Sequence, residues 1–241
     1  MITKNQIKLI RSLRLKKNRI KHNLFVAEGE KIVDELLESK FKLSYLFSTE
    51  NKYNSIKNHV SLKNQELKQI SSLKTPNKVL AVFEIPQENH IDYSQNIIAL
   101  EEINDPGNLG TIIRLCDWFG IKDIICSENS VDCFNPKTIQ ASMGSICRVN
   151  ISYVSFKNLI SNQKNNLIAA DMKGKNINNF PFKSNQIILF GSESNGFSDD
   201  LSNHIEDKIT IPRYNQNIDS LNLASSVAIV LSELKNKITE K

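Results

Sequence analysis

Three polar loops hold the residues whose types and spacing could do chemistry. They read NDPGNLGTIIR at residues 104–114, FGSESNG at 190–196 and IPRYNQNIDSLNLASS at 211–226. Each follows a short apolar run typical of a buried strand, and ligands of parallel α/β sheets gather beyond the carboxyl ends of the strands. We therefore expect the three loops to form one site.

Common catalytic and nucleotide-binding motifs do not match these loops. Gly107 and Gly110 lack the third glycine of a dinucleotide-binding fingerprint, and Gly191 with Gly196 is followed by Phe-Ser where a phosphate-binding loop needs Lys-Ser or Lys-Thr. The chain also has no G-x-S-x-G elbow, no histidine cluster and no C-x-x-C pair. Hydrolase, oxidoreductase and metalloenzyme functions are therefore disfavoured, no metal is expected, and the four cysteines are predicted to be buried free thiols.

Five polar side chains of these loops each have an ordinary structural interpretation. Arg114 lies one helical turn past the first loop, where an arginine is commonly exposed or salt-bridged. Asn108 could be a turn residue or a helix cap, and Glu193 could complement a helix dipole. Ser220 and Asn222 could be the N-cap pair of the last helix.

The elements that must position these loops alternate between strands and helices. Apolar runs predict strands at Ile97–Leu100, Asp123–Cys126, Leu167–Ala170, Ile187–Phe190 and Lys208–Ile211. Helices are predicted between and after them, including Leu109–Phe119 and Leu223–Ile238, the second with a 3.6-residue apolar spacing. This rhythm predicts an α/β fold, a mostly parallel sheet with helices on both faces.

A polar stretch around Pro86–Tyr93 separates this region from the front of the chain. The front segment combines helical spacing within residues 32–37 with strand-like runs at Leu43–Ser48 and Val79–Glu84, as in a small α/β unit. The polar stretch reads as a short linker. Two domains are therefore predicted, at residues 1–88 and 95–241.

The front segment is strongly basic. Residues 1–90 carry 17 lysines and arginines against 9 acidic residues, whereas residues 91–241 carry 14 against 17. The densest run comprises Arg11, Arg14, Lys16, Lys17, Arg19 and Lys21. This run could neutralise several phosphates of a nucleic acid, although on charge alone a solvated helix face is the more ordinary interpretation.

Composition indicates a folded protein that stays in the cytoplasm. Of 241 residues, 40% are apolar and 24% charged, which allows a sizeable core and argues against disorder. No apolar stretch approaches the roughly 18 to 20 residues that span a bilayer. Lysines and arginines interrupt the first residues, where a signal peptide would have an apolar run.

Taken together and in this order, the three loops resemble the signature motifs of the SpoU (TrmH-like) family of RNA ribose 2'-O-methyltransferases, within the SPOUT superfamily. The resemblance covers about residues 97–235. The matching positions are N-x-G with a later arginine (Asn108, Gly110, Arg114), G-x-E-x-x-G (Gly191, Glu193, Gly196), I-P (Ile211, Pro212) and S-L-N (Ser220, Leu221, Asn222). Residues 135–145 look like the family's segment between the first two motifs, and residues 25–37 look like part of the small α/β/α substrate-binding domain that many members carry.

The resemblance implies an enzyme that transfers a methyl group from S-adenosylmethionine to a ribose 2'-hydroxyl of ribosomal or transfer RNA, ribosomal RNA being slightly favoured. It also implies a deep trefoil knot in the C-terminal domain, which sequence physics would not propose. The implied catalytic residues are Arg114, Asn108, Glu193, Ser220 and Asn222, with Glu193 fixing Arg114 or Asn108. The implied cofactor-binding residues are Gly191, Ile211, Leu221, Gly196 and Pro212.

Arg114 is the implied catalytic arginine, and its chemistry limits its role. A guanidinium stays protonated and is a poor base, so we expect it to orient the ribose hydroxyl and the adjacent phosphate through its bidentate fork. Proton removal would then be assisted by other groups of the site.

The implied partners are structured RNA and a second copy of the chain, because the family works as homodimers; neither DNA nor a membrane is expected. RNA would be bound by Arg11, Arg14, Lys16, Lys17 and Arg19. Two departures from the family concern RNA contacts: Gln140 replaces a frequent arginine, and residues 213–219 lack a glycine. The alternative is a non-catalytic RNA-binding protein that kept the fold, which the retention of all five catalytic positions disfavours.

Overall fold

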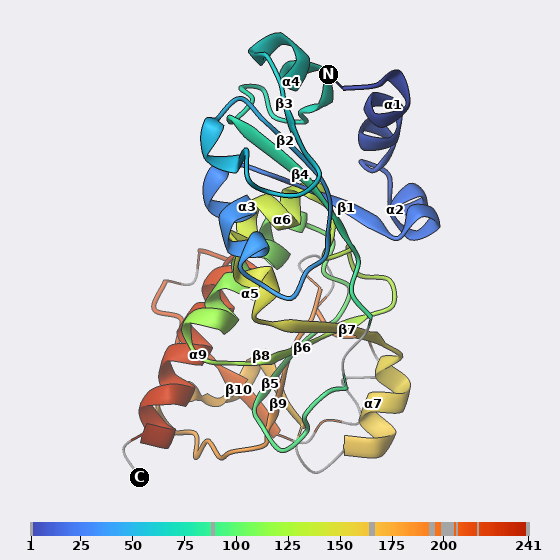
Figure 1. Ribbon diagram of the computed structural model, residues 1–241. Coiled ribbons are helices and arrows are strands. Elements are labelled where there is room, and N and C mark those ends of the chain that lie inside the picture. Colours follow the sequence, from blue (N-terminus) through green and yellow to red (C-terminus); the bar gives the residue numbers. More distant parts are fainter. Residues whose placement is uncertain are drawn as a thin grey trace. The chain divides into compact units, whose positions relative to one another are not determined.

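The computed structural model describes residues 2–87, 90–163, 167–192, 196–198, 205, 207–215 and 217–239 (Figure 1). The chain divides into two compact units. The first unit combines Met1–Gln87 with Asp132–Cys147, and the second combines Glu88–Val131 with Arg148–Lys241. A segment from the middle of the chain therefore belongs to the unit built by the front. No helix of the described ranges is long and apolar enough to cross a membrane.

The first unit is built on a four-stranded sheet in the order β1 (Leu24–Glu28), β4 (Val79–Glu84), β2 (Leu43–Ser48) and β3 (His59–Ser61). β4 is antiparallel to both neighbours, and β2 is parallel to β3. The strands predicted at residues 43–48 and 79–84 are confirmed. The helices of this unit are α1 (Lys4–Ser12), α2 (Lys16–His22), α3 (Glu30–Leu37), α4 (Asn64–Ile70) and α6 (Pro136–Ser142), with short 3-10 turns at Asn51–Tyr53 and Ser145–Cys147.

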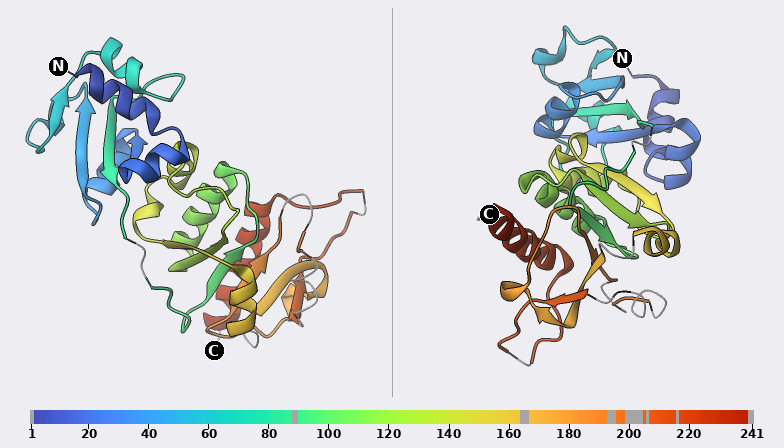
Figure 2. Two further views of the ribbon diagram at one scale, coloured as in Figure 1. Left: turned by 90° about the vertical axis from the view of Figure 1, so that its right-hand side faces the viewer. Right: turned by 90° about the horizontal axis from the view of Figure 1, so that it is seen from below.

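Alternation along β1 sends neighbouring side chains into two different cores. Val26 joins a cluster with Ile10 and Leu13, from α1 and its C-cap, and with Leu67 of α4. Figure 2 shows α1 and α2, in dark blue, along one face of this sheet. Phe25 points to the other face, where its ring packs 4.8 Å from that of Phe134. Aromatic packing therefore anchors the segment 132–147 to the front of the chain.

The second unit is built on a six-stranded sheet in which every described pairing is parallel. Its order is β10 (Asp207–Thr210), β8 (Leu167–Asn176), β9 (Ile187–Phe190), β5 (Ile97–Leu100), β6 (Asp123–Ser127) and β7 (Asn150–Val154). The five predicted strands are confirmed, with β8 longer than expected and β10 beginning one residue earlier. β7 has no counterpart among the predictions, because its half-buried edge sequence NISYV lacks a continuous apolar run.

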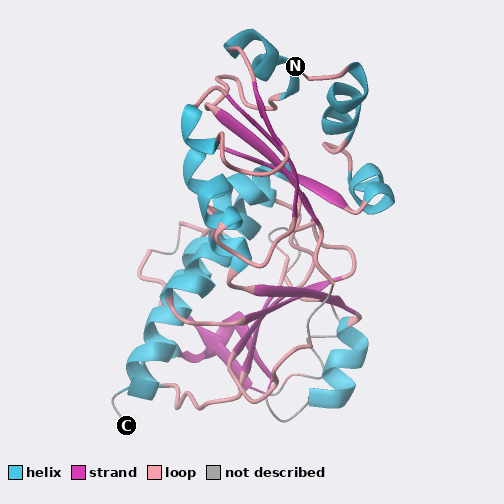
Figure 3. Ribbon diagram, viewed as in Figure 1, coloured by secondary structure: helices cyan, strands magenta, loops and turns pink. Residues whose placement is uncertain are grey.

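Helices cover both faces of this sheet, as predicted (Figure 3). α7 (Phe156–Gln163) packs Phe156, Leu159 and Ile160 on one face. α5 (Pro106–Trp118) and α9 (Leu223–Thr239) pack against each other on the opposite side. A 3-10 turn at Ile177–Asn179 completes the described elements of the unit. The parallel sheet is buried between these layers, so the chemistry must lie at its strand ends.

The pairing of β8 with β10 is irregular. Lys208 pairs with Ala169, but the next residue, Ile209, pairs with Lys175. Gly174 lies so close to the Ile209 backbone that a Cβ there would overlap it. The trefoil knot stays a prediction, because residues 193–195, 199–204, 206 and 216 lie outside the described part of the path.

Candidate active site

The candidate site begins where β5 and β9 end side by side. Leu100 pairs with Phe190 at the last position of both strands, so the loops that follow leave the sheet together. β5 also pairs with β6 on its other side. The strands that follow β5 in sequence are therefore added on both of its sides, and the direction of strand addition changes at β5. Such a switch point is where open α/β sheets bind ligands.

The start of α5 fixes Asn108. The Asp105 carboxylate caps the helix by accepting from the Asn108 backbone N–H at 2.7 Å, and Pro106 supplies a first helical residue that needs no N–H donor. Asp105, and not Asn108, is therefore the cap.

Asn222 meets Asn108 across 114 residues of sequence. Its Nδ2 donates to Oδ1 of Asn108 at 3.1 Å. Asn222 also caps α9, because its Oδ1 accepts from the backbone N–H of Ser225 at 3.3 Å. The N-cap interpretation is thus correct for Asn222 but incomplete, since the same side chain joins the third loop to the first.

Arg114 lies on the exposed surface of α5. Among the described residues it has no ion-pair partner. Side chains on a helix lean toward its N-terminus, and Gly107 and Gly110 lie seven and four residues before Arg114 on the same side. An arginine there can extend along a smooth helix surface toward the turn that carries Asn108.

The loop after β9 closes on itself through two glycines. The backbones of Ser192 and Gly196 exchange hydrogen bonds of 2.9 and 3.0 Å. A Cβ on Gly191 would come within 2.5 Å of the Gly196 carbonyl carbon, and Gly196 has φ of +67°. Both glycines are therefore required by the tight turn. Glu193, with its predicted contact to Arg114 or Asn108, lies outside the described residues.

Glu101 is a further residue of this region that the sequence reasoning missed. It follows β5 directly, is 8% exposed, and accepts at Oε1 from the Ser198 hydroxyl at 2.7 Å and at Oε2 from the Ser198 N–H at 3.2 Å. Its own N–H donates to the Phe190 carbonyl at 2.9 Å. Glu101 thus ties the loop after β9 to the end of β5. A buried-strand run that ends in a carboxylate was the available signal.

The third loop presents apolar surface beside the two asparagines. Leu221 is 51% exposed, Ile211 and Pro212 are half-buried, and Ser220 is exposed. Arg213 donates to the Ile218 carbonyl at 3.2 Å and so closes the intervening loop.

The cysteines and acidic residues give no metal site among the described residues, where no cluster of three His, Cys, Asp or Glu could hold an ion. None of the four cysteines, all of which lie in the described ranges, forms a disulfide; three are buried and Cys147 is half-buried. Burial raises the pKa of the Cys116 thiol well above its usual range, which keeps it protonated.

The five basic residues predicted to bind RNA fall into two groups. Arg11 and Arg14 are exposed and donate to the carbonyls of Gln69 and Ser71 at 2.6 and 2.7 Å, so they also attach α1 to the end of α4. Lys16 and Lys17 are exposed on α2.

Arg19 differs from the other four because it is 1% exposed. It donates to Asp132 through Nε and Nη2, at 2.8 and 2.6 Å, and to the carbonyls of Leu13 and Arg14. Its guanidinium faces the protein interior, so we remove Arg19 from the proposed RNA-binding set.

Comparison with known proteins matches this arrangement to one family. The model of the SpoU rRNA Methylase family matches residues 95–232, and that of the MRM3-like substrate binding domain matches residues 4–81. The chain is 26% identical to the 23S rRNA (guanosine(2553)-2'-O)-methyltransferase RlmP of Bacillus subtilis, over 96% of this chain and 97% of that protein.

Two solved structures cover nearly the whole chain. A TrmH-family protein from Porphyromonas gingivalis is 32% identical with a TM-score of 0.90, covering 98% of this chain and 99% of its own. The AdoMet-bound rRNA methyltransferase from Sinorhizobium meliloti is 27% identical with a TM-score of 0.87, covering 98% and 96%. The chain belongs to the SpoU rRNA methylase family.

Proposed function

We propose that this protein transfers a methyl group from S-adenosylmethionine to a ribose 2'-hydroxyl of ribosomal RNA. The observation that carries the proposal is the Asn222–Asn108 hydrogen bond, which joins the third motif to the first on the helix that also presents Arg114. The match to RlmP over 97% of that protein's length favours ribosomal RNA as the substrate. The cytoplasm is accordingly the proposed location.

The residues of the third loop fit the methyl donor. An adenosine needs apolar cover for its ring and polar main-chain groups for its edge. Exposed Leu221 and half-buried Ile211 and Pro212 offer the first, and their backbone offers the second. Gly191 and Gly196 allow backbone approach without a side chain in the way. When bound, the donor supplies a methyl group already activated by its sulfonium.

Alignment is therefore the main task of the protein groups. The Arg114 fork holds the hydroxyl oxygen and the neighbouring phosphate of the RNA, which fits its exposure. The hydrogen bond between Asn108 and Asn222 fixes the surface against which the ribose lies. The hydroxyl oxygen would form its bond to the methyl carbon as the bond between that carbon and the donor sulfur breaks, and the sulfur would leave as a neutral thioether. The hydroxyl proton would go to an acceptor other than the guanidinium, which stays protonated.

The test is methyl transfer from radiolabelled S-adenosylmethionine to ribosomal and transfer RNA isolated from cells that lack this gene. Label should enter ribosomal RNA as an alkali-resistant dinucleotide, the product of ribose methylation. Arg114→Ala and Arg114→Lys should both lower the rate by about 100-fold or more, because lysine keeps the charge and loses the fork.

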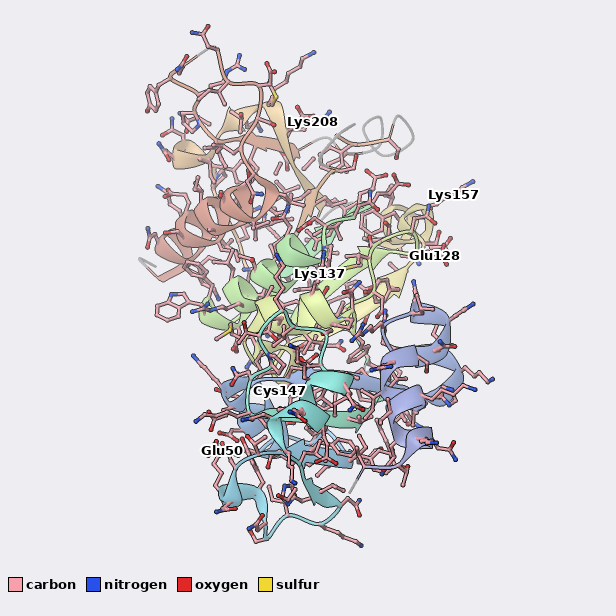
Figure 4. All side chains as sticks on the ribbon, turned by 90° about the horizontal axis from the view of Figure 1, so that it is seen from above. Glu50, Glu128, Lys137, Cys147, Lys157 and Lys208 are labelled. Atoms are coloured by element: carbon pink, nitrogen blue, oxygen red, sulfur yellow. The ribbon has the colours of Figure 1, made fainter. Side chains whose placement is uncertain are left out.

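Lys157 provides the matched control, since it is an exposed cation on α7, the helix that covers the other face of the sheet (Figure 4). Lys157→Ala should keep the wild-type rate. RNA binding without label in either RNA pool and without cofactor binding would instead support the non-catalytic RNA-binding alternative. Label in transfer RNA alone would contradict the proposed substrate.

We also propose two partners. Structured RNA is bound by the front unit, where Arg11, Arg14, Lys16 and Lys17 are exposed. A second copy of the chain covers apolar side chains of α5 and α9, where Trp118 is 84% and Ile229 is 40% exposed.

A further inference from the structure

The short helix α2 carries an unusual combination of charge and exposed apolar surface. Residues 1–27 contain eight lysines and arginines and no acidic residue. Within this run Ile20 is 67% exposed and Leu15, the N-cap of α2, is 55% exposed. The exposed apolar side chain of Ile20, surrounded by cations, would fit a partner that is both anionic and partly apolar.

The orientation of α2 is fixed by Arg19. Its buried guanidinium holds Asp132 and two carbonyls at the end of α1, so the side of the helix opposite Arg19 must face outward. Lys17 and Lys21, two positions before and after Arg19, lie on that outer side, and Ile20 follows Lys17 by three residues. All three side chains are exposed. They define one surface, which we call the Ile20 face.

The charges of the Ile20 face are not balanced by ion pairs within the described part of the chain. None of the described acidic side chains forms an ion pair with Lys17 or Lys21. The helix also places Lys16 and Lys17 in its first turn, with no acidic residue there, where the helix dipole disfavours cations. A second copy of the chain would present the same cations and be repelled, whereas RNA phosphates would relieve the repulsion.

The exposed Ile20 side chain restricts the kind of RNA that this face could bind. In a regular A-form duplex the base faces are stacked inside, and the accessible groove presents hydroxyls and polar base edges. An aliphatic side chain gains burial against RNA mainly by covering the face of an unstacked base.

We propose that the Ile20 face recognises an unpaired nucleotide in structured RNA. Ile20 covers the exposed base while Lys17 and Lys21 bind the phosphates on either side of it. The proposal rests on the proposed function for its substrate class and adds the feature of the RNA that the front unit selects.

The test measures binding of the full-length protein, by fluorescence anisotropy at several salt concentrations, to two RNAs. One is a perfect duplex, and the other is the same duplex with a bulge of three unpaired nucleotides. The wild type should bind the bulged RNA about tenfold more tightly. Ile20→Ala should reduce that preference to less than about twofold and leave the salt dependence unchanged.

Two further variants separate charge from apolar contact. Lys17→Gln with Lys21→Gln should weaken binding to both RNAs alike and lower the slope of log K against log salt by about 1.5 to 2. Met172→Ala is the matched control, because Met172 is an equally exposed apolar residue, 63%, on β8 of the second unit. It should leave both affinities unchanged, and thermal melting checks that every variant folds.

Three results would overturn the proposal: no preference of the wild type for the bulge, a preference that survives Ile20→Ala, or a loss of oligomer mass on Ile20→Ala without an effect on RNA binding. The last would identify a protein contact. Methyl transfer is assayed separately on the same samples. Bulge preference without methyl transfer would reject the proposed function alone, and methyl transfer with unchanged binding by Ile20→Ala would reject this inference alone.

Discussion

At the scale of residues, Glu101 should control cofactor binding without touching the cofactor. Glu101→Gln replaces one acceptor with a donor, so either the N–H or the hydroxyl of Ser198 loses its partner in a buried place. The loop after β9, which holds Gly191 and Gly196, then loses its tie to β5. We expect the dissociation constant for S-adenosylmethionine, measured by calorimetry, to rise about tenfold, because the cofactor then binds more weakly.

The neighbouring carboxylate supplies the control for this prediction. Glu102 is exposed, and from the described residues its side chain accepts only a long bond, 3.4 Å, from Asn129. Glu102→Gln removes the same charge and should change the dissociation constant by less than twofold. Equal effects of the two variants would show that charge alone, and not the tie to Ser198, matters.

The position of the three loops after apolar strands singled them out for chemistry, whereas the catalytic roles of Asn108, Arg114 and Asn222 were implied only by the resemblance to the SpoU family. The direct bond between the two asparagines was beyond sequence reasoning, since it depends on how α5 and α9 pack. The burial of Arg19 could not be predicted from the sequence either. Helical spacing cannot separate a buried arginine from exposed ones when its partner, Asp132, lies 113 residues away.

At the scale of elements, α2 should depend on the Arg19–Asp132 ion pair. The helix has seven residues, no side-chain N-cap bond and no acidic residue in its first turn, so little local energy supports it. Arg19→Met leaves Asp132, whose side chain is 14% exposed, without its cation. Breaking a buried pair in this way should lower the free energy of unfolding by about 3 kcal/mol, measured by urea denaturation.

Lys17→Met on the same helix is the control, and its exposed position predicts a change within about 0.5 kcal/mol. Arg19→Met with Asp132→Leu should recover part of the loss, because no buried charge is then unpaired. A loss that is the same in the single and double variants would contradict the role of the pair and point to packing of the arginine stem.

The elements themselves were largely predictable, because the buried strands of a parallel sheet are continuous apolar runs. The placement of α6 in the first unit was not predictable. Residues 132–147 sit in the middle of the methyltransferase match yet join the first unit, through Phe134 on Phe25 and Asp132 on Arg19. No local sequence pattern in residues 132–147 predicts packing against residues more than 100 positions earlier.

At the scale of the whole molecule, the exposed apolar side chains of α5 and α9 predict a homodimer. Trp118 is 84% exposed, and leaving so large a ring in water is costly, because burying an aromatic side chain removes roughly 150 to 250 Å² from solvent. Light scattering should therefore give the wild type twice the mass of one 27.4 kDa chain. Trp118→Glu and Ile229→Glu place a charge in the apolar contact and should each yield the single-chain mass.

The melting temperature offers an independent check on this contact. Because association stabilises only the folded chain, the melting temperature of a dimer rises with protein concentration. The rise should be present in the wild type and in Met172→Glu, which adds the same charge to an exposed apolar position on β8, and absent in Trp118→Glu. A wild type of single-chain mass at all concentrations would sink the prediction. Dissociation by Met172→Glu but not by Trp118→Glu would move the contact from the surface of α5 and α9 to the surface around Met172 of β8.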